Sequence, residues 1–517
     1  RLSTRVSHSQ SIVEECSREE KPLKDYVKNP QKYVMMPAFA KTRHIEVERR
    51  LEALSLFAET TGLNRIEWAD TKIGVICSGI AYQYVTEALG EKASVLKLGL
   101  IFPLPEQMIR DFAQKVDKLY AAPGNGGISK YAECFNVKAT DIDGCVELAK
   151  KLRPDYVFVA PDDPLVMGMV DKLNAEGFKT FGPRANAAIL EGSKVFSKAL
   201  MKKYNIPTAA YETFTDADEA IAYIKKQNSF PAVIKCDGLA LGKGVIIAKD
   251  EQEAENAVRS MLLDGKFGKS GSEIVVEEFM TGPEVTVLAF TDGKTVKPMI
   301  SSMDHKRAYD NDEGLNTGGM GTIAPNPLYT PDKQQECMEK IFLPTIKAMA
   351  AEGRPFKGCL YFGLMLTPNG AKVIEYNCRF GDPETQVVLP LLETDIMDII
   401  EAVWEEKLDT LDIKWSDKSC ACVVMASGGY PEKYETGKVI SGLDENGQCE
   451  GAFVYHAGTK LEDGKFLTAG GRVLGITAYG DTLKEALDTA YKAVDTISFE
   501  KAHYRHDIGK KALSALK

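Results

Sequence analysis

Short apolar runs alternate with amphipathic stretches through the first part of the chain. Apolar residues at helical spacing predict a helix at about 44–60 within a polar, charge-rich start. Beyond it the runs predict strands at 72–77, 95–102, 117–122 and 156–160 and helices at 81–89, 106–116, 145–152 and 165–176. Strands that alternate with helices of this length predict a parallel, doubly wound sheet, with nucleotide or phosphate sites in loops at the strand carboxyl ends.

The pattern changes in the middle of the chain. A helix is predicted from Thr215 to Lys226, with Asp218 in its first turn. Successive apolar runs then predict antiparallel strands at 232–235, 245–248, 273–278, 284–291 and 295–300. After Asp409 a smaller α+β segment is expected, with strands at 421–426 and 473–479 and a helix that opens on a Thr482–Glu485 capping box.

Composition narrows the class of protein. The 517 residues allow three or four domains, and 44% hydrophobic with 27% charged residues is typical of a globular protein. A net charge of −10 argues against a nucleic-acid partner. Eleven cysteines without a CxxC pair suit a reducing compartment, so a cytoplasmic location is expected. Because no apolar run reaches transmembrane length and no signal-peptide pattern opens the chain, no membrane partner is expected.

The strongest chemical pattern is VIEYNCRFGDPETQ, residues 373–386. Strand alternation places Glu375, Asn377 and Arg379 on one face. A carboxylate and an amide oxygen there suit Mg²⁺ on a triphosphate, and the guanidinium could neutralise a transferring phosphoryl oxygen. The alternative is an exposed strand with solvated polar residues, although the following Gly-Asp-Pro-Glu turn adds carboxylates at the strand end.

A glycine-rich loop lies upstream, in KCDGLALGKG at 235–244. Its glycines let the backbone close over a polyphosphate while its amides donate to it, and Lys235 could reach the α- or β-phosphate. It is not a P-loop, because Ser or Thr and a helix do not follow its lysine. Many hairpins carry two glycines, so the pattern gains weight mainly from the polar strand that follows it.

Three further stretches could join the same site. Residues 277–284 would form a hinge, with backbone near Glu278–Met280 at adenine and Glu284 at the ribose, or else an ordinary surface turn. Charges of both signs crowd the loop DHKR at 304–307, which is either functional or solvated. The turn NTGGMG at 316–321 offers consecutive amides to an anion. Structural hydrogen bonds are expected for His456, His503 and His506.

Together these motifs resemble the ATP-grasp superfamily, and within it the glycinamide ribonucleotide synthetase family, from about Lys118 to Leu516. The resemblance rests on APGNGG (122–127), FGP (181–183), LEGSK (190–194), KCDGLALGKGV (235–245), VVEEF (275–279), DHKR (304–307), NTGGMG (316–321), EYNCRFGDPETQ (375–386), AGTK (457–460), GGRVLGITA (470–478) and HYRHDIG (503–509). It implies that ATP phosphorylates glycine and that 5-phosphoribosylamine then captures the glycyl phosphate. ATP with Mg²⁺ or Mn²⁺ would be the cofactor and those two small molecules the substrates of a monomer.

The resemblance also implies roles for matching residues. Nucleotide contacts would be Lys194, Lys235, Gly238, Gly242, Lys243, Glu277, Glu278 and Glu284, and metal ligands Glu375 and Asn377. Catalytic contacts would be Arg379, Arg307, Asp304 and Asp382, and other substrate contacts Gly124, Asn125, Gly126, Asn316, Thr317, Gly318 and Gly319.

The implied fold is multidomain, α/β and α+β. An ATP-grasp core is expected at 194–404, after a Rossmann-like pre-ATP-grasp domain at 95–193 and before a small α+β domain at 410–517. Residues 1–94 would form a foreign α/β segment.

The start of the chain departs from the family pattern. Residues 1–117 resemble an internal piece of the indolepyruvate:ferredoxin oxidoreductase α subunit, through STRVSHSQSIVE (3–14), KYVMMPAFAKTRHIEVERRL (32–51), IGVICSGIAYQYVTEAL (73–89) and VLKLGLIFPLP (95–105). The family instead opens with a strand, a glycine-rich loop and a helix. We expect residues 95–122 to replace this unit in the sheet, with Phe-Pro-Leu-Pro as a loop that offers fewer amides to the ribose phosphate.

Two alternatives to an intact ligase stay open. One is an oxidoreductase subunit, although residues 1–117 lack a thiamine-diphosphate signature and a ferredoxin-like cysteine set. The other is a hybrid chain with impaired or absent ligase activity, from gene fusion or misassembly. The first residue, Arg1 rather than Met, suggests a fragment or a lost start.

Overall fold

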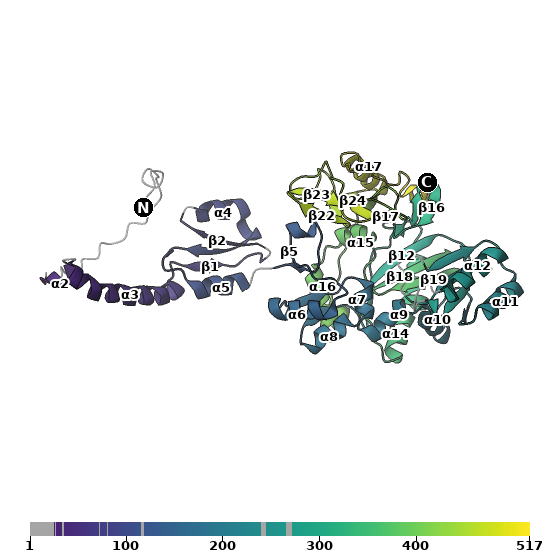
Figure 1. The fold of residues 1–517 in the computed structure, drawn as a ribbon, viewed down its shortest axis with the longest axis horizontal. Helices are drawn as coiled ribbons and strands as arrows, with labels where there is room; N and C mark the ends of the chain where they lie inside the picture. Colours follow the sequence, from purple (N-terminus) through teal and green to yellow (C-terminus); the bar gives the residue numbers. More distant parts are fainter. Residues whose placement is uncertain are drawn as a thin grey trace. The chain divides into compact units, whose positions relative to one another are not determined.

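The computed structural model describes residues 25, 27–33, 36–71, 73–79, 81–114, 118–238, 244–264 and 271–516. The chain divides into two compact units, Arg1–Lys118 and Leu119–Lys517 (Figure 1). Within the described residues, every helix is too short or too polar to cross a membrane.

The first unit contains a three-stranded sheet in the order β1-β3-β2. Strand β3 lies in the middle, antiparallel to β1 and parallel to β2, and Leu96 and Leu98 pack with Phe112 in a small core. The elements are α2 (Pro30–Tyr33), α3 (Pro37–Thr60), β1 (Arg65–Glu67), β2 (Gly74–Ser78), α4 (Ala81–Leu89), η1 (Gly90–Lys92), β3 (Ser94–Leu98) and α5 (Glu106–Gln114).

This pairing corrects one expectation from the sequence. Residues 95–122 were to supply a strand to the sheet of the following domain, with the domain boundary at 94/95. Strand β3 instead has a partner on both edges within the first unit, and the boundary between the compact units falls at Lys118/Leu119. A strand with both edges paired has no free hydrogen-bonding groups to add to another sheet.

The second unit opens with the predicted alternation of strands and helices. Strands β4 and β5 pair in parallel, as do β6 and β7. The helix predicted at 165–176 is two helices, because Gly168 adopts φ of 90° and breaks it. The elements are β4 (Tyr120–Ala121), η2 (Ile128–Lys130), β5 (Glu133–Cys134), α6 (Ile142–Leu152), β6 (Tyr156–Phe158), α7 (Asp162–Val166), α8 (Met169–Ala175), β7 (Lys179–Phe181) and α9 (Ala185–Gly192).

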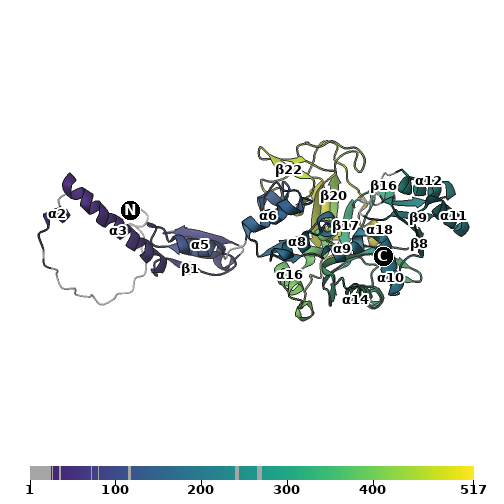
Figure 2. The same ribbon diagram turned by 60° about the horizontal axis from the view of Figure 1, so that its bottom comes forward.

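An antiparallel four-stranded sheet follows, which we call the small sheet. Its order is β10-β9-β11-β8, and α11 and α12 pack on it through a common core (Figure 2). Helix α11 begins at Ala217 and not at Thr215 as predicted, and it is capped by Asp216, whose carboxylate accepts from the amides of Asp218 and Glu219. The elements are α10 (Lys194–Lys203), β8 (Tyr211–Phe214), α11 (Ala217–Gln227), β9 (Ala232–Cys236), β10 (Val245–Ala248), α12 (Glu251–Leu262) and β11 (Ile274–Glu278).

A second antiparallel sheet, the large sheet, has the order β13-β12-β18-β19. Its strands are β12 (Glu284–Asp292), β13 (Val296–Pro298), β18 (Lys357–Thr367) and β19 (Gly370–Asn377). One face is apolar: Val287, Phe362 and Tyr376 join the largest core, where α9 and α14 (Leu343–Ala351) also pack. The opposite face, which we call the polar face, is mixed: Leu288 and Phe290 join a second core, and Glu375 and Asn377 also lie on this face.

A five-stranded sheet, β14-β17-β20-β24-β21, completes the second unit. Its strands are β14 (Met303–Asp304), β17 (Gly321–Ala324), β20 (Ser419–Ala426), β21 (Phe453–His456) and β24 (Arg472–Gly480). Strands β17 and β20 are antiparallel neighbours, and Figure 2 shows them together. Helix α17 (Leu483–Val494) packs against this sheet and opens on the predicted capping box of Thr482 and Glu485.

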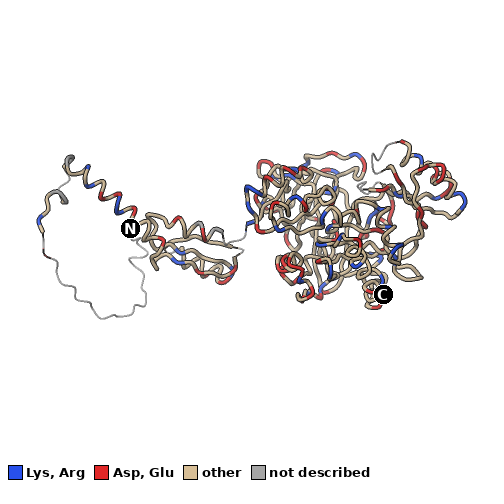
Figure 3. The backbone as a smooth tube through the Cα atoms, turned by 90° about the horizontal axis from the view of Figure 1, so that it is seen from below, with Lys and Arg blue, Asp and Glu red and all other residues tan. Residues whose placement is uncertain are grey.

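Shorter elements connect these sheets. They are β15 (Arg307–Tyr309), η4 (Asp310–Asp312), β16 (Glu313–Asn316), α13 (Pro331–Cys337), η5 (Met338–Phe342), α15 (Thr385–Val388), η6 (Leu389–Leu391), α16 (Ile396–Trp404), η7 (Leu408–Thr410), β22 (Thr459–Glu462), β23 (Lys465–Thr468) and α18 (Lys510–Ala515). Basic and acidic segments are interspersed over the second unit (Figure 3).

Candidate active site

The polar face of the large sheet carries the Glu-Asn pair found in the sequence. Glu375 lies opposite Gly363 and Asn377 opposite Tyr361, in the register of β19 against β18. Tyr376, between them, points into the apolar core. The predicted alternation is thus confirmed for these residues, and the absence of a side chain at Gly363 leaves room for the Glu375 carboxylate.

Cations surround Glu375. Burial disfavours its charged form, but Lys306, Lys235, Lys194 and Arg379 together outweigh burial and hold the pKa of Glu375 below its usual value. Lys306 also pairs with Glu284, whose Oε2 lies 3.2 Å from the Lys306 Nζ. Attraction to Glu284 raises the pKa of Lys306 well above the ordinary lysine value. The Glu375 carboxylate is therefore ionised, and several positively charged side chains surround it.

The small sheet contributes a buried trio of charges. Glu277 Oε1 lies 3.0 Å from Lys235 Nζ and 3.2 Å from Lys198 Nζ, and all three side chains are buried. Lys198 also donates to the hydroxyl of Thr208 at 2.7 Å. Burial lowers the pKa of Lys198 to about 8. Lys198 had no signal in the sequence, because it lies in an ordinary amphipathic helix.

Lys235 connects the two sheets. Its Nζ donates to the carbonyl oxygen of Ile374 on β19, at 3.3 Å, directly before Glu375. The ammonium group of β9 therefore reaches the polar face of the large sheet. This contact brings the predicted phosphate-binding lysine next to the predicted metal-binding carboxylate.

The start of the glycine-rich loop is anchored on α10. Lys194 Nζ donates to the Gly238 carbonyl oxygen at 2.7 Å, and the Asp237 carboxylate accepts from the Ser193 hydroxyl and the Val195 amide. Gly238 has φ of 82°, which favours glycine. The remaining predicted loop residues, Gly242 and Lys243, lie outside the described residues.

Glu278 lies at the end of β11. Its carboxylate forms an ion pair with Lys372 at 2.7 Å and accepts from the amide of Ala210 at 3.1 Å. The hydrogen bond to Lys372 is the main cause of the lowered pKa of Glu278. These contacts join the end of β11 to β19 and to the residue before β8.

Arg379 lies just beyond β19, close to Asn377. Its Nη2 is 3.5 Å from Asn377 Oδ1 and 3.7 Å from Glu191 Oε1. Glu191 is buried in α9 and accepts from the amide of Cys378 at 2.6 Å. Burial raises the pKa of Glu191 to about 7 even though Arg379 opposes the rise. Arg379 thus has an ion-pair partner, Glu191, that the sequence pattern did not reveal.

A second group of carboxyls lies nearby. Glu384 is buried and accepts from the Tyr361 hydroxyl at 3.0 Å, which also contacts Thr286 at 2.9 Å. Asp304 accepts from the His305 amide at 2.7 Å. Burial and the charge of Glu384 raise the pKa of Asp304 well above its usual value, because two adjacent carboxylates resist ionising together.

The turn of Asn316, Thr317, Gly318 and Gly319 is arranged differently from the sequence expectation. Its amides are already used: Thr317 donates to Lys306 O, Gly318 to the Tyr430 hydroxyl, Gly319 to the Thr317 hydroxyl and Met320 to His305 O. They therefore do not form a ready anion nest. The carbonyl oxygen of Gly318 instead accepts from Arg472 at 2.8 Å.

Asp382 belongs to the same region. Its Oδ2 lies 2.9 Å from Arg472 Nη2, and its carbonyl oxygen accepts from Arg472 Nη1 at 2.8 Å. Arg307, in contrast, donates to the carbonyl oxygen of Gly314 at 2.7 Å within the β15–β16 hairpin. Of the residues predicted as catalytic contacts, Asp382 is joined to the Gly318 turn through Arg472. Arg307 is held within the β15–β16 hairpin.

The four histidines of the second unit make structural hydrogen bonds. His305 is buried between Gly321 O and the Gly509 amide, and burial lowers its pKa to about 4. His456 contacts Thr459 and Gly447. His503 contacts Ala308 O, and His506 pairs with Asp310.

The APGNGG loop rests on the C-terminal part of the chain. Asn125 Nδ2 donates to the carbonyl oxygen of His456 at 2.6 Å, and the Gly126 amide donates to Thr459 O at 3.1 Å. A side chain at Gly124 would meet Cys134 Sγ at 2.4 Å. The loop geometry thus depends on Asn125 and on two glycines.

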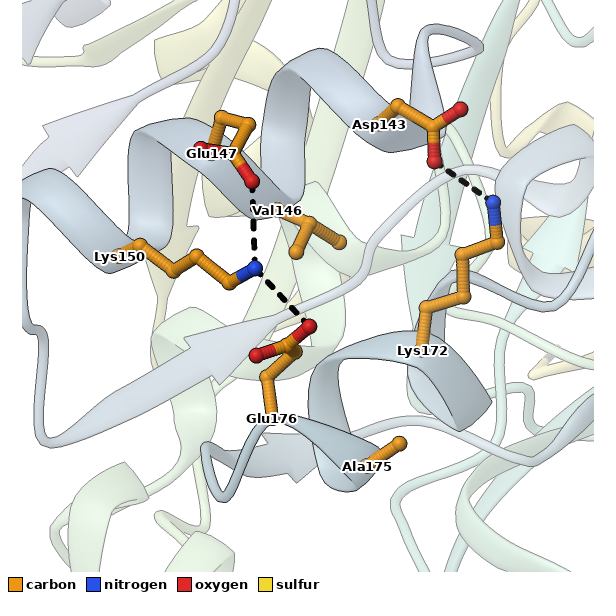
Figure 4. Close-up of a pocket in the computed structure, with 7 residues that line it drawn as sticks. All are labelled: Asp143, Val146, Glu147, Lys150, Lys172, Ala175 and Glu176. Carbon is orange, nitrogen blue, oxygen red and sulfur yellow. Dashed lines mark hydrogen bonds and ion pairs between the residues drawn. The ribbon is translucent and has the colours of Figure 1, made fainter.

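Figure 4 shows a cavity of about 380 Å³ between α6 and α8. Its charges pair with each other: Lys150 with Glu147 and Glu176, and Lys172 with Asp143. None of its lining residues belongs to the polar groups described above.

The side chains around Glu375 offer few oxygen ligands to a divalent cation. Among the described residues, no group of three or more His, Cys, Asp or Glu side chains is arranged to hold a metal. Glu375 and Asn377 nevertheless present a carboxylate and an amide oxygen on one face, and Lys306, Lys235 and Lys194 lie near the Glu375 carboxylate. Two protein oxygens with substrate phosphates suit Mg²⁺. The residues therefore fit a cation that is shared with a nucleotide.

Comparison with known families identifies the same parts of the chain. Three domain models of phosphoribosylglycinamide synthetase match: the N domain at 106–191, the ATP-grasp (A) domain at 192–385 and the C domain at 420–511. The N-domain match includes α5, although α5 belongs to the first compact unit.

Curated relatives and a solved structure agree with these matches. The phosphoribosylamine–glycine ligase of Caldanaerobacter subterraneus subsp. tengcongensis is 48% identical over 396 residues, which are 77% of this chain and 94% of the relative. That of Vibrio parahaemolyticus is 45% identical over 402 residues, 77% of this chain and 93% of the relative. The crystal structure of phosphoribosylamine–glycine ligase from Thermotoga maritima matches with a TM-score of 0.67 at 31% identity and covers 77% of this chain and 95% of that one.

The fold is shared more widely. The biotin carboxylase domain of the Hydrogenobacter thermophilus 2-oxoglutarate carboxylase matches with a TM-score of 0.59 at 17% identity, covering 77% of this chain and 88% of that one, which shows a common fold alone. The three domain matches and the long, closely similar relatives place this chain in the phosphoribosylamine–glycine ligase family of ATP-grasp enzymes, which use ATP with a divalent metal.

Proposed function

We propose that this chain performs the ligation for which its relatives are named. It would transfer the γ-phosphoryl group of ATP to the glycine carboxylate and then join the glycyl group to the amine of 5-phosphoribosylamine. The products would be glycinamide ribonucleotide, ADP and phosphate, a step of purine biosynthesis. Activation is needed because a carboxylate is a poor electrophile whose oxygen is a poor leaving group.

The contact of Lys235 with β19 carries this proposal. A lysine from the small sheet lies 3.3 Å from the Ile374 carbonyl oxygen, beside Glu375 on the large sheet. A nucleotide held between the two sheets would therefore meet Lys235, Lys194 and Lys306 near its phosphates. These charges are positioned before the reaction, so they can stabilise negative charge as it moves from ATP to the glycyl phosphate.

We assign complementary roles to the residues around this point. Glu375 and Asn377 would hold Mg²⁺ or Mn²⁺, and the bound ion would supply additional charge neutralisation. Arg379 would contact a transferring phosphoryl oxygen, held in place by Glu191. Glu277 would orient Lys235 through the buried trio. Glu284 would take part in ribose binding, and Glu278 would fix the hinge near adenine.

We also assign residues to the binding of glycine and of the amine substrate. Asp304, Arg307 and Asp382 would contact glycine or the amine, together with the turn of Asn316–Gly319 and the APGNGG loop at Gly124–Gly126. In the second unit, Asn125 and Gly126 dock on residues 456–459, so the N and C domains would enclose the amine substrate together. The chain would act as a cytoplasmic monomer.

A second candidate is a ligase impaired at the amine. The N-domain match begins at residue 106, and β3 has both edges paired within the first unit. A strand and glycine-rich loop that open the family's domain would then have no replacement among the residues that the structure describes. We infer that ATP and glycine are used normally while the amine binds weakly.

Separate measurements of the two half-reactions test both candidates. Glycine-dependent isotope exchange between bridging and non-bridging β-phosphate oxygens of ATP reports the glycyl phosphate, and amide product detected by mass spectrometry reports the amine step. Lys235→Met should lower kcat/KM for ATP at least about a hundredfold, about 3 kcal/mol. Lys226→Met, on the exposed face of α11, is the matched control.

The outcomes separate the possibilities. An intact ligase gives both signals, and the impaired form gives exchange with a raised Michaelis constant for the amine. Absence of glycine-dependent exchange from the unmutated protein would overturn the proposed function. An ordinary Michaelis constant for the amine would overturn the impaired form.

A further inference from the structure

Arg472 on β24 contacts two turns of the second unit, the glycine turn at 316–319 and the Gly-Asp-Pro-Glu turn at 381–384. Its Nη1 donates to Gly318 O and Asp382 O, each at 2.8 Å, and its Nη2 pairs with Asp382 Oδ2 at 2.9 Å. A weaker bond reaches Gly319 O at 3.4 Å. One guanidinium therefore joins the glycine turn to the Gly-Asp-Pro-Glu turn.

The turn is fixed from its other side as well. The Gly318 amide donates to the Tyr430 hydroxyl at 3.2 Å, and the Thr317 hydroxyl donates to Lys306 O at 2.8 Å. The turn thus connects Lys306, which pairs with Glu284, to Tyr430 and Arg472 in the C-terminal part of the chain. A side chain at Gly319 would meet Pro383 Cδ at 2.4 Å and Asp304 Oδ1 at 2.7 Å, so the turn lies directly against Asp304 and against the proline that follows Asp382.

Asp382 is exposed but held in one orientation. Its side chain is 51% exposed, while Oδ2 contacts Arg472 and Oδ1 accepts from Gln386 Nε2 at 2.8 Å. Bonds to both oxygens remove rotational freedom from the carboxylate, and each oxygen still has acceptor capacity. A fixed, accessible carboxylate suits the ammonium end of a small zwitterionic amino acid whose own carboxylate faces the lysines.

Arg472 begins strand β24 of the five-stranded sheet. Strand β24 pairs with β20, which pairs with β17, the strand that follows the glycine turn. Asp304 lies on β14, the next strand in the same sheet. Arg472 is therefore held by strand pairing at the start of β24, opposite Ala426 where the register shifts, and not by a free loop.

We propose that Arg472 is a positioning residue for the amino-acid subsite: it holds Asp382 and the Gly318–Gly319 turn so that the ammonium group of glycine is received in a fixed place. The inference rests on the proposed function. Arg472 lies in the C domain, so this domain would contribute to glycine binding as well as to the acceptor side.

Arg472→Met removes the bonds and keeps much of the side-chain volume. We expect it to raise the Michaelis constant for glycine in the isotope exchange at least about tenfold. The Michaelis constant for ATP should stay within about twofold, because Lys235, Glu375 and Asn377 are untouched. Arg472→Lys should recover part of the loss, since one ammonium can replace only some of a planar fork. Tyr430→Phe, which removes one bond to the turn, should show a smaller effect in the same direction.

Lys438→Met is the matched control. Lys438 has a similar exposure, 26% against 20% for Arg472, and pairs with Glu435 and Glu500 away from the turn. It should leave both Michaelis constants unchanged. The thermal midpoints of both variants are compared to exclude general destabilisation.

Three results are distinguishable. A selective rise for glycine supports the inference. Equal changes for ATP and glycine, or none for either, overturn it while the unmutated protein still exchanges isotope. If the unmutated protein shows no glycine-dependent exchange, the proposed function itself fails, and the inference falls with it.

Discussion

The buried trio of Lys198, Glu277 and Lys235 shows how a single carboxylate can serve two cations. Each ammonium is buried and within 3.2 Å of the same Glu277 oxygen. Removing the shared carboxylate would leave two buried ammonium groups facing each other, and such groups are strongly destabilising without a partner. Glu277 is therefore expected to stabilise the fold through both cations.

Glu277→Gln should lower the free energy of unfolding by about 3 kcal/mol. Urea denaturation followed by circular dichroism measures this change. Glu212→Gln is the control, because Glu212 is exposed on β8 opposite Val276. Equal stability losses in the two variants would show that the trio does not behave as a buried charge cluster.

His305 should give the protein a distinct sensitivity to acid. Its pKa is lowered by burial to about 4, whereas a histidine in the unfolded chain titrates near about 6.5. Between these values the unfolded state binds the additional proton, so the stability contribution is present above about pH 6.5 and is lost as pH falls toward about 4. Arg505, Asp312 and Asp507 lie close enough to modify the value.

The measurement is the difference in unfolding free energy between the unmutated protein and His305→Gln. Glutamine can still donate and accept a hydrogen bond but does not titrate. The difference should shift by on the order of 3 kcal/mol between about pH 7.5 and about pH 4. A difference that is independent of pH would contradict a buried, neutral histidine.

At the scale of elements, the sequence predicts the start of a helix correctly where neighbouring residues cap that helix. The capping box of α17 is confirmed, with Thr482 accepting from the Glu485 amide and the Glu485 side chain accepting from Thr482. Thr482→Ala should destabilise the protein by about 1 kcal/mol and Thr482→Ser should not, as measured by the urea midpoint. Equal effects of Ala and Ser would mean that the hydroxyl does not cap the helix.

Other features depend on contacts that sequence spacing does not reveal. The two-residue period of β19 correctly placed Glu375 and Asn377 on one face. Glu191, Tyr361 and Arg472 lie in an apolar helix or in strands, where nothing local distinguishes them from core or surface residues. The amides of the NTGGMG turn were expected to be free, but their partners, such as Tyr430, come from distant parts of the chain.

At the scale of the molecule, the described site residues all lie in the second unit. The first unit has its own small core of Leu96, Leu98 and Phe112. A chain that spans only Leu119–Lys517 should therefore retain glycine-dependent isotope exchange, with a Michaelis constant for ATP within about twofold of the full chain.

Differential scanning calorimetry provides an independent comparison. The full chain should show a transition that is missing from the shortened chain, because two separate cores can unfold separately. Loss of exchange together with loss of the main transition would show instead that the second unit needs residues 1–118 to fold.

The five-stranded sheet has a consequence for how this family can be recombined. Its strands β14 and β17 lie in the region matched as the ATP-grasp domain, and β20, β24 and β21 in the region matched as the C domain. A C domain produced alone would expose the edge of β20 that normally pairs with β17, and an open edge is a template for aggregation. When domains are exchanged between relatives, residues 303–324 and 420–511 should therefore come from the same protein. The five-stranded sheet then keeps its own strand pairing, although the boundary between the two domain matches divides it.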